Sequence, residues 1–170
     1  MTTLAWDGKH LAADRQVSLG GDFPCYVGNH CKIRKVTRWL GQSGDQRHDY
    51  FVVTAGRVLD GQKFESWVEH YLTMGGTYPK LSEGFIGLVM DCEGRVKKYL
   101  EDSDGWGEDI TDTPSAFGNA GRDFAMGVMA YGGSAMKAVE LASGYCLFTG
   151  GGVDYVSVDD QEIKQWTVEC

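Results

Sequence analysis

Thr2-Thr3-Leu4-Ala5-Trp6-Asp7-Gly8-Lys9-His10-Leu11-Ala12-Ala13-Asp14 is the stretch that decides the fold of this chain. Two short apolar segments, 3–6 and 10–13, flank Asp7-Gly8, and Asp-Gly between such segments is a strong signal for a two-residue β-hairpin turn. Asp14 follows directly, where a turn residue is expected. The chain therefore begins with an antiparallel pair of strands that ends at a carboxylate.

The rest of the chain predicts further strands and helices that occur in groups. Apolar residues at i, i+3, i+4, i+7 and i+8 predict a helix over 64–72. Two more helices are expected, one through 124–131 and one over 135–142 that Ser134 caps. Eight further segments have the composition of strands: 17–19, 32–40, 50–55, 84–91, 95–100, 116–118, 145–149 and 153–158. A polar loop is expected between the first two of these segments, an acidic loop over 101–114, and a polar tail at the end of the chain. Such grouping predicts an α+β layered domain.

Length and charge limit the class of protein. The 170 residues suit one domain over 1–170. Twenty-four acidic against 16 basic residues give a net charge of −8, which argues against a nucleic-acid partner. A transmembrane helix is not expected, because no run of about 18 apolar residues occurs. The first residues lack the basic start and apolar stretch of a signal peptide, so a cytoplasmic location is predicted.

The five cysteines, at positions 25, 31, 92, 146 and 170, are an odd number in a chain of this kind. A disulfide framework is therefore not expected, and we interpret them as free buried thiols. A zinc cluster is an alternative, but its spacing matches no known zinc knuckle; its ligands would be Cys25, His30, Cys31 and His48.

Five segments along the chain share their order with one known family. They are Thr2-Thr3-Leu4-Ala5 with Leu11-Ala12-Ala13-Asp14, then Lys32-Ile33, Thr54-Ala55-Gly56, Ala116-Phe117-Gly118-Asn119 and Phe148-Thr149-Gly150-Gly151. In these segments the chain resembles proteasome β-subunits and their bacterial relative HslV, over roughly residues 2–158. The resemblance implies the N-terminal nucleophile (Ntn) hydrolase fold, a four-layer αββα sandwich in which two stacked antiparallel sheets are flanked by helices.

The resemblance also implies a threonine-type endopeptidase whose nucleophile is Thr2. A threonine hydroxyl needs a base to remove its proton. Once Met1 is removed, the α-amine of Thr2 is that base, because its ordinary pKa of about 7.7–8.0 lies near the working pH. The same residue would then supply both nucleophile and base.

The remaining catalytic roles follow from matched positions. Lys32 would stabilise negative charge on the Thr2 oxygen, and Asp14 would hold Lys32 in place. The backbone N–H of Gly56 would donate to the oxyanion of the tetrahedral intermediate. Asn119 stands where family members have a serine that tunes the terminal amine, and Arg57 stands where a second glycine is expected.

The resemblance assigns a substrate pocket and an ion site as well. The positions that match the specificity pocket are Val17, Ser18, His30, Thr54 and Val58. Their small to medium side chains predict apolar or small residues before the cut. No cofactor is required, but HslV binds a sodium-type ion through backbone carbonyls of a late turn, which here corresponds to Ser143, Cys146 and Thr149.

Family members assemble into rings, so a homo-oligomeric ring that receives protein or peptide substrates from an AAA+ ATPase unfoldase is implied. Neither a nucleic acid nor a membrane is expected as a partner. Two alternatives remain open. One is a non-catalytic assembly member of the same fold that retains Met1, and the other is an amidohydrolase that cleaves small amides.

Overall fold

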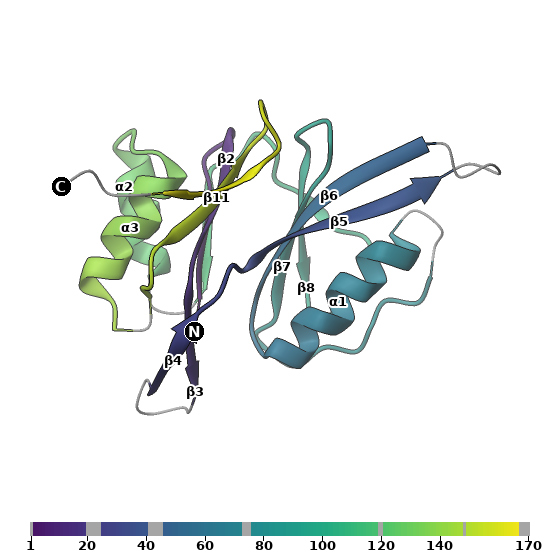
Figure 1. The fold of residues 1–170 in the computed structure, drawn as a ribbon, viewed down its shortest axis with the longest axis horizontal. Coiled ribbons are helices and arrows are strands. Elements are labelled where there is room, and N and C mark those ends of the chain that lie inside the picture. The colour runs from purple at the N-terminus through teal and green to yellow at the C-terminus, as the bar shows by residue number, and fades with distance from the viewer. Residues whose placement is uncertain are drawn as a thin grey trace. The chain divides into compact units, whose positions relative to one another are not determined.

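The computed structural model describes residues 2–19, 25–40, 46–72, 76–118, 121–147 and 149–166. The contacts within the chain divide it into two compact units, shown in Figure 1. Unit 1 comprises Met1–Ile33 and Asp112–Cys170, and unit 2 comprises Arg34–Thr111. Each unit is described by itself.

Unit 1 is built on a five-stranded antiparallel sheet with the order β10-β1-β2-β11-β12. Its strands are β1 (Thr3–Trp6), β2 (His10–Asp14), β10 (Ser115–Gly118), β11 (Val153–Ser157) and β12 (Ile163–Trp166). A separate two-stranded ribbon contains β3 (Gln16–Leu19) and β4 (Cys25–Asn29). Strands from both ends of the chain thus lie side by side around β1 and β2.

The predicted hairpin between β1 and β2 is confirmed. Asp7 Oδ1 accepts hydrogen bonds from the backbone N–H groups of Lys9 and His10, at 2.9 and 2.7 Å. Gly8 has a φ of +92°, which a residue without Cβ adopts at little cost. The turn therefore depends on the Asp7 carboxylate as a hydrogen-bond acceptor and on the conformational freedom of Gly8.

Two helices, α2 (Arg122–Ala130) and α3 (Ala135–Tyr145), cover one face of this sheet (Figure 1). Ser134 accepts a hydrogen bond from the N–H of Lys137 and so caps α3, as predicted. Small side chains let the helices lie close to the strands; the buried members of this cluster are Ala5, Ala12, Ala116, Ala125, Ala135, Met136, Ala138, Val139 and Val153.

Unit 2 contains a second five-stranded antiparallel sheet, β5-β6-β7-β8-β9, and helix α1 (Val58–Tyr71) packs on one face of it (Figure 1). Its strands are β5 (Ile33–Leu40), β6 (Gln46–Ala55), β7 (Ile86–Met90), β8 (Val96–Leu100) and β9 (Glu108–Asp109). Phe64 of α1 lies at the centre of the core, with ring centroids of Phe85 and Tyr99 each 5.3 Å away. A Cβ on Gly87 would approach the Phe64 ring to 2.6 Å, so glycine makes room for the aromatic core.

The predicted α+β class is confirmed by these two sheets and three helices. Five local predictions were wrong, one of them the acidic loop over 101–114, which contains strand β9. Helix α3 continues through Tyr145, so no strand begins there. The predicted polar loop after β3 contains strand β4, and the predicted polar tail contains strand β12. Helix α1 also begins earlier than expected, at Val58.

One charged cluster in unit 2 predicts a measurable pH dependence of stability. Asp49, whose side chain is 18% exposed, bonds Lys35 at 2.9 Å, Thr37 at 2.7 Å and Arg47 at 3.0 Å. Burial alone would raise the pKa of Asp49, but the hydrogen bonds from these three side chains outweigh it and lower the pKa to about 2. Since the pKa is lower in the folded state, the ionised carboxylate stabilises the fold above pH 4, and this contribution is lost as the pH falls toward 2.

We expect Asp49→Asn to lower the free energy of unfolding at pH 7 by about 1–2 kcal/mol after allowance for solvent screening. The difference from the unmodified protein should shrink toward zero between pH 4 and pH 2, as measured by urea unfolding at each pH. Asp104→Asn, at an exposed loop position, is the control and should change little. An equal loss at pH 7 and pH 2 would contradict the assignment.

Candidate active site

Three side chains predicted to act together meet in unit 1. Thr2 precedes β1, Asp14 ends β2, and Lys32 lies directly before β5. Lys32 Nζ donates a hydrogen bond to Thr2 Oγ1 at 2.9 Å and another to Asp14 Oδ1 at 2.9 Å. The Lys32 side chain is 11% exposed and that of Asp14 is 0% exposed. The structure therefore places a buried cation between a hydroxyl and a carboxylate.

The Asp14 carboxylate uses both oxygens within the protein. Oδ1 accepts from the N–H of Thr3 at 2.8 Å in addition to Lys32. Oδ2 accepts from the N–H of Gln16 at 3.1 Å and, more weakly, from that of Gly150 at 3.4 Å. These four hydrogen bonds fill the acceptor capacity of a carboxylate. The Asp14 side chain is therefore held in place by backbone N–H groups of β1, β3 and the turn at Gly150.

Burial governs the ionisation of the pair. It raises the pKa of Asp14, although Lys32 and the N–H groups of Thr3 and Gly150 oppose the change. It also lowers the pKa of Lys32, against the attraction of Asp14. Because the Lys32 side chain is largely shielded from solvent, bulk water competes little with its hydrogen bond to Thr2 Oγ1.

The backbone of Thr2 is held close to β10. Thr3 pairs with Gly118, whose φ is +105°. A Cβ built on Gly118 would lie 1.7 Å from the Thr2 carbonyl oxygen, closer than any side chain can approach. Gly118 is thus required by two independent features, its backbone conformation and its distance from Thr2.

A second contact fixes β1 from the opposite end of the chain. Thr3 Oγ1 and Thr149 Oγ1 are 2.7 Å apart and share a hydrogen bond, across a separation of 146 residues. A Cβ on Gly121 would lie 2.1 Å from Thr3 Oγ1 and 2.9 Å from Thr149 Oγ1. Gln16 Nε2 also donates to the Leu147 carbonyl at 3.0 Å, which ties β3 to the same turn.

Gly56 lies in unit 2, at the end of β6, and has a φ of +134°. A Cβ there would contact Phe85 at 3.4 Å in addition to the strained backbone. Arg57 follows as the N-cap residue of α1, without a side-chain hydrogen bond to the helix. The local geometry agrees with a turn that requires glycine, and the oxyanion role of Gly56 stays a prediction. Asn119 lies outside the described residues.

The predicted pocket residues are placed as follows. Val17 is half-buried on β3, His30 is exposed after β4, and the Ser18 side chain lies outside the described part of the chain. In unit 2, Val58 is 67% exposed at the first position of α1. Thr54 is half-buried on β6, and its hydroxyl faces α1, where a Cβ on Gly61 would come within 2.7 Å of Thr54 Oγ1. Their joint role in substrate binding stays a prediction.

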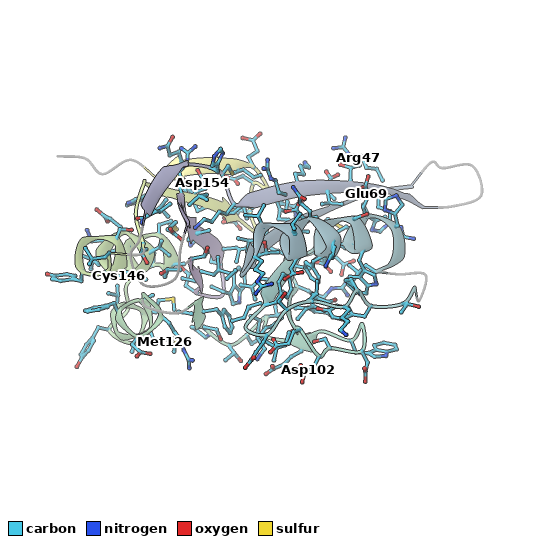
Figure 2. All side chains as sticks on the ribbon, turned by 90° about the horizontal axis from the view of Figure 1, so that it is seen from below. Arg47, Glu69, Asp102, Met126, Cys146 and Asp154 are labelled. Carbon is cyan, nitrogen blue, oxygen red and sulfur yellow. The ribbon has the colours of Figure 1, made fainter. Side chains whose placement is uncertain are left out.

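The predicted ion site lies where α3 ends. Ser143 donates its hydroxyl to the Val139 carbonyl at 2.9 Å, and the Cys146 carbonyl accepts from the N–H of Thr149 at 3.1 Å. Figure 2 shows Cys146 beside the helices of unit 1. A carbonyl oxygen has a second lone pair, and carbonyls at a helix C-terminus carry partial negative charge, so the donor set is compatible with a monovalent cation. The ion itself stays a prediction.

The cysteines differ in exposure. Cys146 is buried, Cys31 is half-buried and Cys92 is exposed. The prediction of buried thiols was therefore wrong for Cys92, which lies in the tight turn between β7 and β8. Within the described residues, no group of three or more His, Cys, Asp or Glu side chains could hold a metal ion.

Solved structures resemble the fold of this chain over nearly its whole length. A Gly-1 mutant of Anbu from Hyphomicrobium sp. strain MC1 matches with a TM-score of 0.67 and 13% identity, over 99% of this chain and 88% of that one. The chain has the fold of Anbu. A second structure of Anbu from Hyphomicrobium matches with a TM-score of 0.63 and 14% identity, over 99% of this chain and 88% of that one. Anbu from Yersinia bercovieri, described as an ancestral β-subunit, matches with a TM-score of 0.61 and 14% identity, over 100% of this chain and 88% of that one.

The Anbu fold agrees with the α+β fold that the sequence predicts. No protein-family model matches the chain, and a search of curated proteins finds no match either. At 13–14% identity the likeness concerns the fold. No helix in the described part of the chain is long and apolar enough to cross a membrane.

The sequence reasoning missed several residues that shape the site. Gly118 and Gly121 make room for Thr2 and Thr3, and Thr149 holds the Thr3 hydroxyl. Gly118 stands in a segment used for the resemblance but without a role assigned to it, and Thr149 was predicted only as part of the ion site. The signal available was the glycine at the end of a short strand, Gly118, because glycine in a strand often marks a close backbone approach.

Proposed function

We propose that this chain is a threonine-type endopeptidase of the Ntn-hydrolase class, with Thr2 as its nucleophile after removal of Met1. The observation that carries the proposal is that Lys32 Nζ lies 2.9 Å from both Thr2 Oγ1 and Asp14 Oδ1. A nucleophilic hydroxyl, a buried cation and a fully bonded carboxylate form the arrangement that acyl transfer requires.

The reaction begins when the α-amine of Thr2 accepts the hydroxyl proton of the same residue. Thr2 Oγ1 then attacks the scissile carbonyl carbon, and the N–H of Gly56 is proposed to bind the resulting oxyanion. When the intermediate collapses, the C–N bond breaks and the ammonium of Thr2 returns its proton to the leaving amine. A water molecule, deprotonated by the same amine, hydrolyses the acyl ester and restores the hydroxyl.

Lys32 contributes to each step through its charge. The Nζ–H group donates to Thr2 Oγ1, so it stabilises the alkoxide character that develops as the proton leaves. A positive charge beside the amine also favours the neutral form of that amine, which is the form that accepts a proton. Asp14 keeps Lys32 in this position by a direct ion pair.

Likeness to Anbu, one structure of which is described as an ancestral β-subunit, supports a ring as the working form. We infer a homo-oligomeric ring in the cytoplasm that encloses the sites and receives unfolded protein from an AAA+ ATPase. Protein or peptide is then the substrate, without a cofactor, and the Na⁺ ion proposed at Ser143, Cys146 and Thr149 is structural.

The state of the N-terminus gives the first test. Intact mass spectrometry of the purified protein is expected to show a species lighter by one methionine, because the base must be a free amine. That species should react covalently with a β-lactone or epoxyketone probe at Thr2, as mapped by peptide mass spectrometry. Thr2→Ala is the control and should carry no label. A processed but unlabelled protein would count against the enzyme, and full retention of Met1 would favour an assembly role.

Turnover separates peptidase from amidase. Casein and small amides are offered to the processed protein under identical conditions, with Thr2→Ala as the blank. Degradation of casein supports the proposal, whereas exclusive turnover of small amides would identify an amidohydrolase.

A further inference from the structure

Unit 2 contains a cavity of about 780 Å³ that none of the sequence motifs predicted. Helix α1, the strands of the sheet and the loop over 101–107 contribute side chains to it. Every described residue that lines the cavity belongs to unit 2, and none of them belongs to the proposed active site. Cavities of this size, with aromatic and apolar walls and a few charged groups, are typical of sites that bind small molecules.

The sheet register explains why charged and aromatic side chains meet at this cavity. Gly87 lies against the ring of Phe64 from α1, and it pairs with Tyr99 of β8. Lys97, two residues before Tyr99, pairs with Asp109 of β9. Side chains at this spacing project from the same face of a sheet. Lys97 and Asp109 therefore lie on the face that α1 covers, next to the aromatic core of unit 2.

Aromatic rings form one wall of the cavity. Trp67 of α1 and Tyr99 of β8 both line it, with their ring centroids 5.6 Å apart in an edge-to-face arrangement. Tyr50 of β6 lines it as well, and the two tyrosines are buried, with exposed fractions of 7% for Tyr50 and 1% for Tyr99. Neither phenol hydroxyl has a hydrogen-bond partner among the residues that the structure describes. Buried hydroxyls normally have one, and a molecule bound in the cavity can supply it.

Trp106 lines the same cavity and is 84% exposed. A Cβ on Gly105, whose φ is +81°, would contact the Trp67 ring at 3.4 Å, and a Cβ on Gly107 would lie 2.6 Å from the Tyr99 ring. The backbone on both sides of Trp106 is thus packed against the aromatic wall, while the indole itself faces solvent. An indole held in this way offers a face to a planar ring that enters the cavity.

The charged side chains at the cavity differ in whether they have a partner. Arg95 forms an ion pair with Asp91 at 2.7 Å. Lys97 lies opposite Asp109 in the register, but no ion pair joins it to any described residue. Asp104 is exposed and also forms no ion pair within the described part of the chain. The cavity thus presents an ammonium and a carboxylate that are available to a ligand.

We propose that this cavity binds a small aromatic zwitterion. The ligand ring stacks on Trp106 and contacts Trp67 and Tyr99. The ligand carboxylate pairs with Lys97, and the ligand ammonium pairs with Asp104. This is the chemistry of an aromatic amino acid, either free or within a short peptide whose two ends are free. The inference goes beyond the proposed function and does not rest on it, because the cavity and the proposed active site share no described residue.

Isothermal titration calorimetry with L-phenylalanine and three analogues tests the assignment of both charges. L-phenylalaninamide lacks the carboxylate, N-acetyl-L-phenylalanine lacks the ammonium, and N-acetyl-L-phenylalaninamide lacks both. We expect L-phenylalanine to bind about tenfold more tightly than the analogue that lacks both charges, because two charge-assisted contacts are lost together. Equal affinities for all four compounds, or no binding of L-phenylalanine, would overturn the inference.

Substitutions at the cavity locate each contact. Lys97→Ala should weaken the binding of L-phenylalanine about threefold but leave that of L-phenylalaninamide unchanged, and Asp104→Asn should do the same with N-acetyl-L-phenylalanine as the unaffected ligand. Trp106→Ala should weaken the binding of L-phenylalanine about tenfold. Lys98→Ala, which removes a lysine that pairs with Glu108 on the opposite face of β8, is the matched control and should bind normally. A loss in Lys98→Ala as large as that in Lys97→Ala would contradict the assignment.

The tripeptide Gly-Phe-Gly distinguishes the two sources of the ligand. It is titrated into Thr2→Ala, which does not cleave it, beside L-phenylalanine. Tighter binding of the tripeptide identifies a short peptide as the ligand, and tighter binding of L-phenylalanine identifies the free amino acid. None of these titrations depends on catalysis. A protein that is labelled at Thr2 but binds neither ligand refutes this inference alone, and a processed protein that binds but carries no label refutes the proposed function alone.

Discussion

Replacing Lys32 by alanine is expected to lower the rate of Thr2 labelling, and of casein hydrolysis, by about 100- to 1000-fold or more. The reason is that Lys32 Nζ is the charged group within hydrogen-bond distance of Thr2 Oγ1, at 2.9 Å. Without it, the developing alkoxide loses the ammonium group that donates a hydrogen bond to it. Second-order labelling rates, with and without the substitution, measure the effect.

Stability must be followed in the same experiment, because Asp14 would remain buried without its cation. Removal of one partner from a buried ion pair destabilises by as much as about 3–5 kcal/mol, but three backbone N–H groups still bond Asp14 and reduce this loss. Lys32→Arg keeps the positive charge while its planar guanidinium cannot reproduce the position of Nζ. We expect Lys32→Arg to fold with near-normal stability and to be as inactive as Lys32→Ala.

The matched control is Lys35→Ala, which removes a lysine that pairs with Asp49 in unit 2. It should label at the normal rate. Activity within threefold of the unmodified protein in either Lys32 variant would refute the assigned role of Lys32.

The second large effect is expected from Gly118→Ala. A Cβ at this position would lie 1.7 Å from the Thr2 carbonyl oxygen, and the φ of +105° is unfavourable for any L side chain. The backbone of β1 or β10 must move to remove the overlap, and the Thr3 pairing and the Lys32 contact to Thr2 depend on that backbone. We expect a loss of more than about 3 kcal/mol in the free energy of unfolding, and labelling of Thr2 that is no longer detectable.

The Gly132→Ala variant separates the effect of backbone strain from that of steric overlap with a neighbouring strand. Gly132 has a φ of +85°, and nothing lies within 4 Å of a Cβ built there. Its substitution should cost about 1–2 kcal/mol from backbone strain alone, with labelling unchanged. Thermal unfolding and labelling of both variants compare the two contributions. Equal losses of stability at positions 118 and 132 would show that the close approach to Thr2 is not what requires glycine.

The sequence predicts best those features of the structure that are stabilised by residues close together in the chain. The hairpin at Asp7-Gly8 and the Ser134 cap need only neighbouring residues, and both are confirmed. Lys32 and Asp14 were assigned through the motif resemblance, and in the structure Lys32 bonds both Thr2 and Asp14. Apolar periodicity located α1, but its first turn, with exposed Val58 and Leu59, breaks the apolar pattern.

The elements that were missed depend on a pairing or packing partner outside their own segment. Strand β4 exists because it pairs with β3, although its segment has the composition of a loop. Strand β12 likewise depends on pairing with β11. Residues 145–149 have strand composition, but α3 continues to Tyr145 because its alanine-rich face packs on the sheet of unit 1. In each case tertiary contacts outweighed a weak local preference.

The sequence by itself determined the first hairpin, the α+β class and the choice of Thr2, Lys32 and Asp14 as the proposed catalytic residues. Local conformational preference and hydrophobic pattern suffice for the first two, and ordered motifs for the third. The tertiary structure alone decided that Thr3 bonds Thr149 across 146 residues, that Gly118 must have no side chain, and that Arg15 lies beside the buried Asp154 carboxylate. These features depend on distances between strands that are remote in sequence, and a linear pattern carries no such distances.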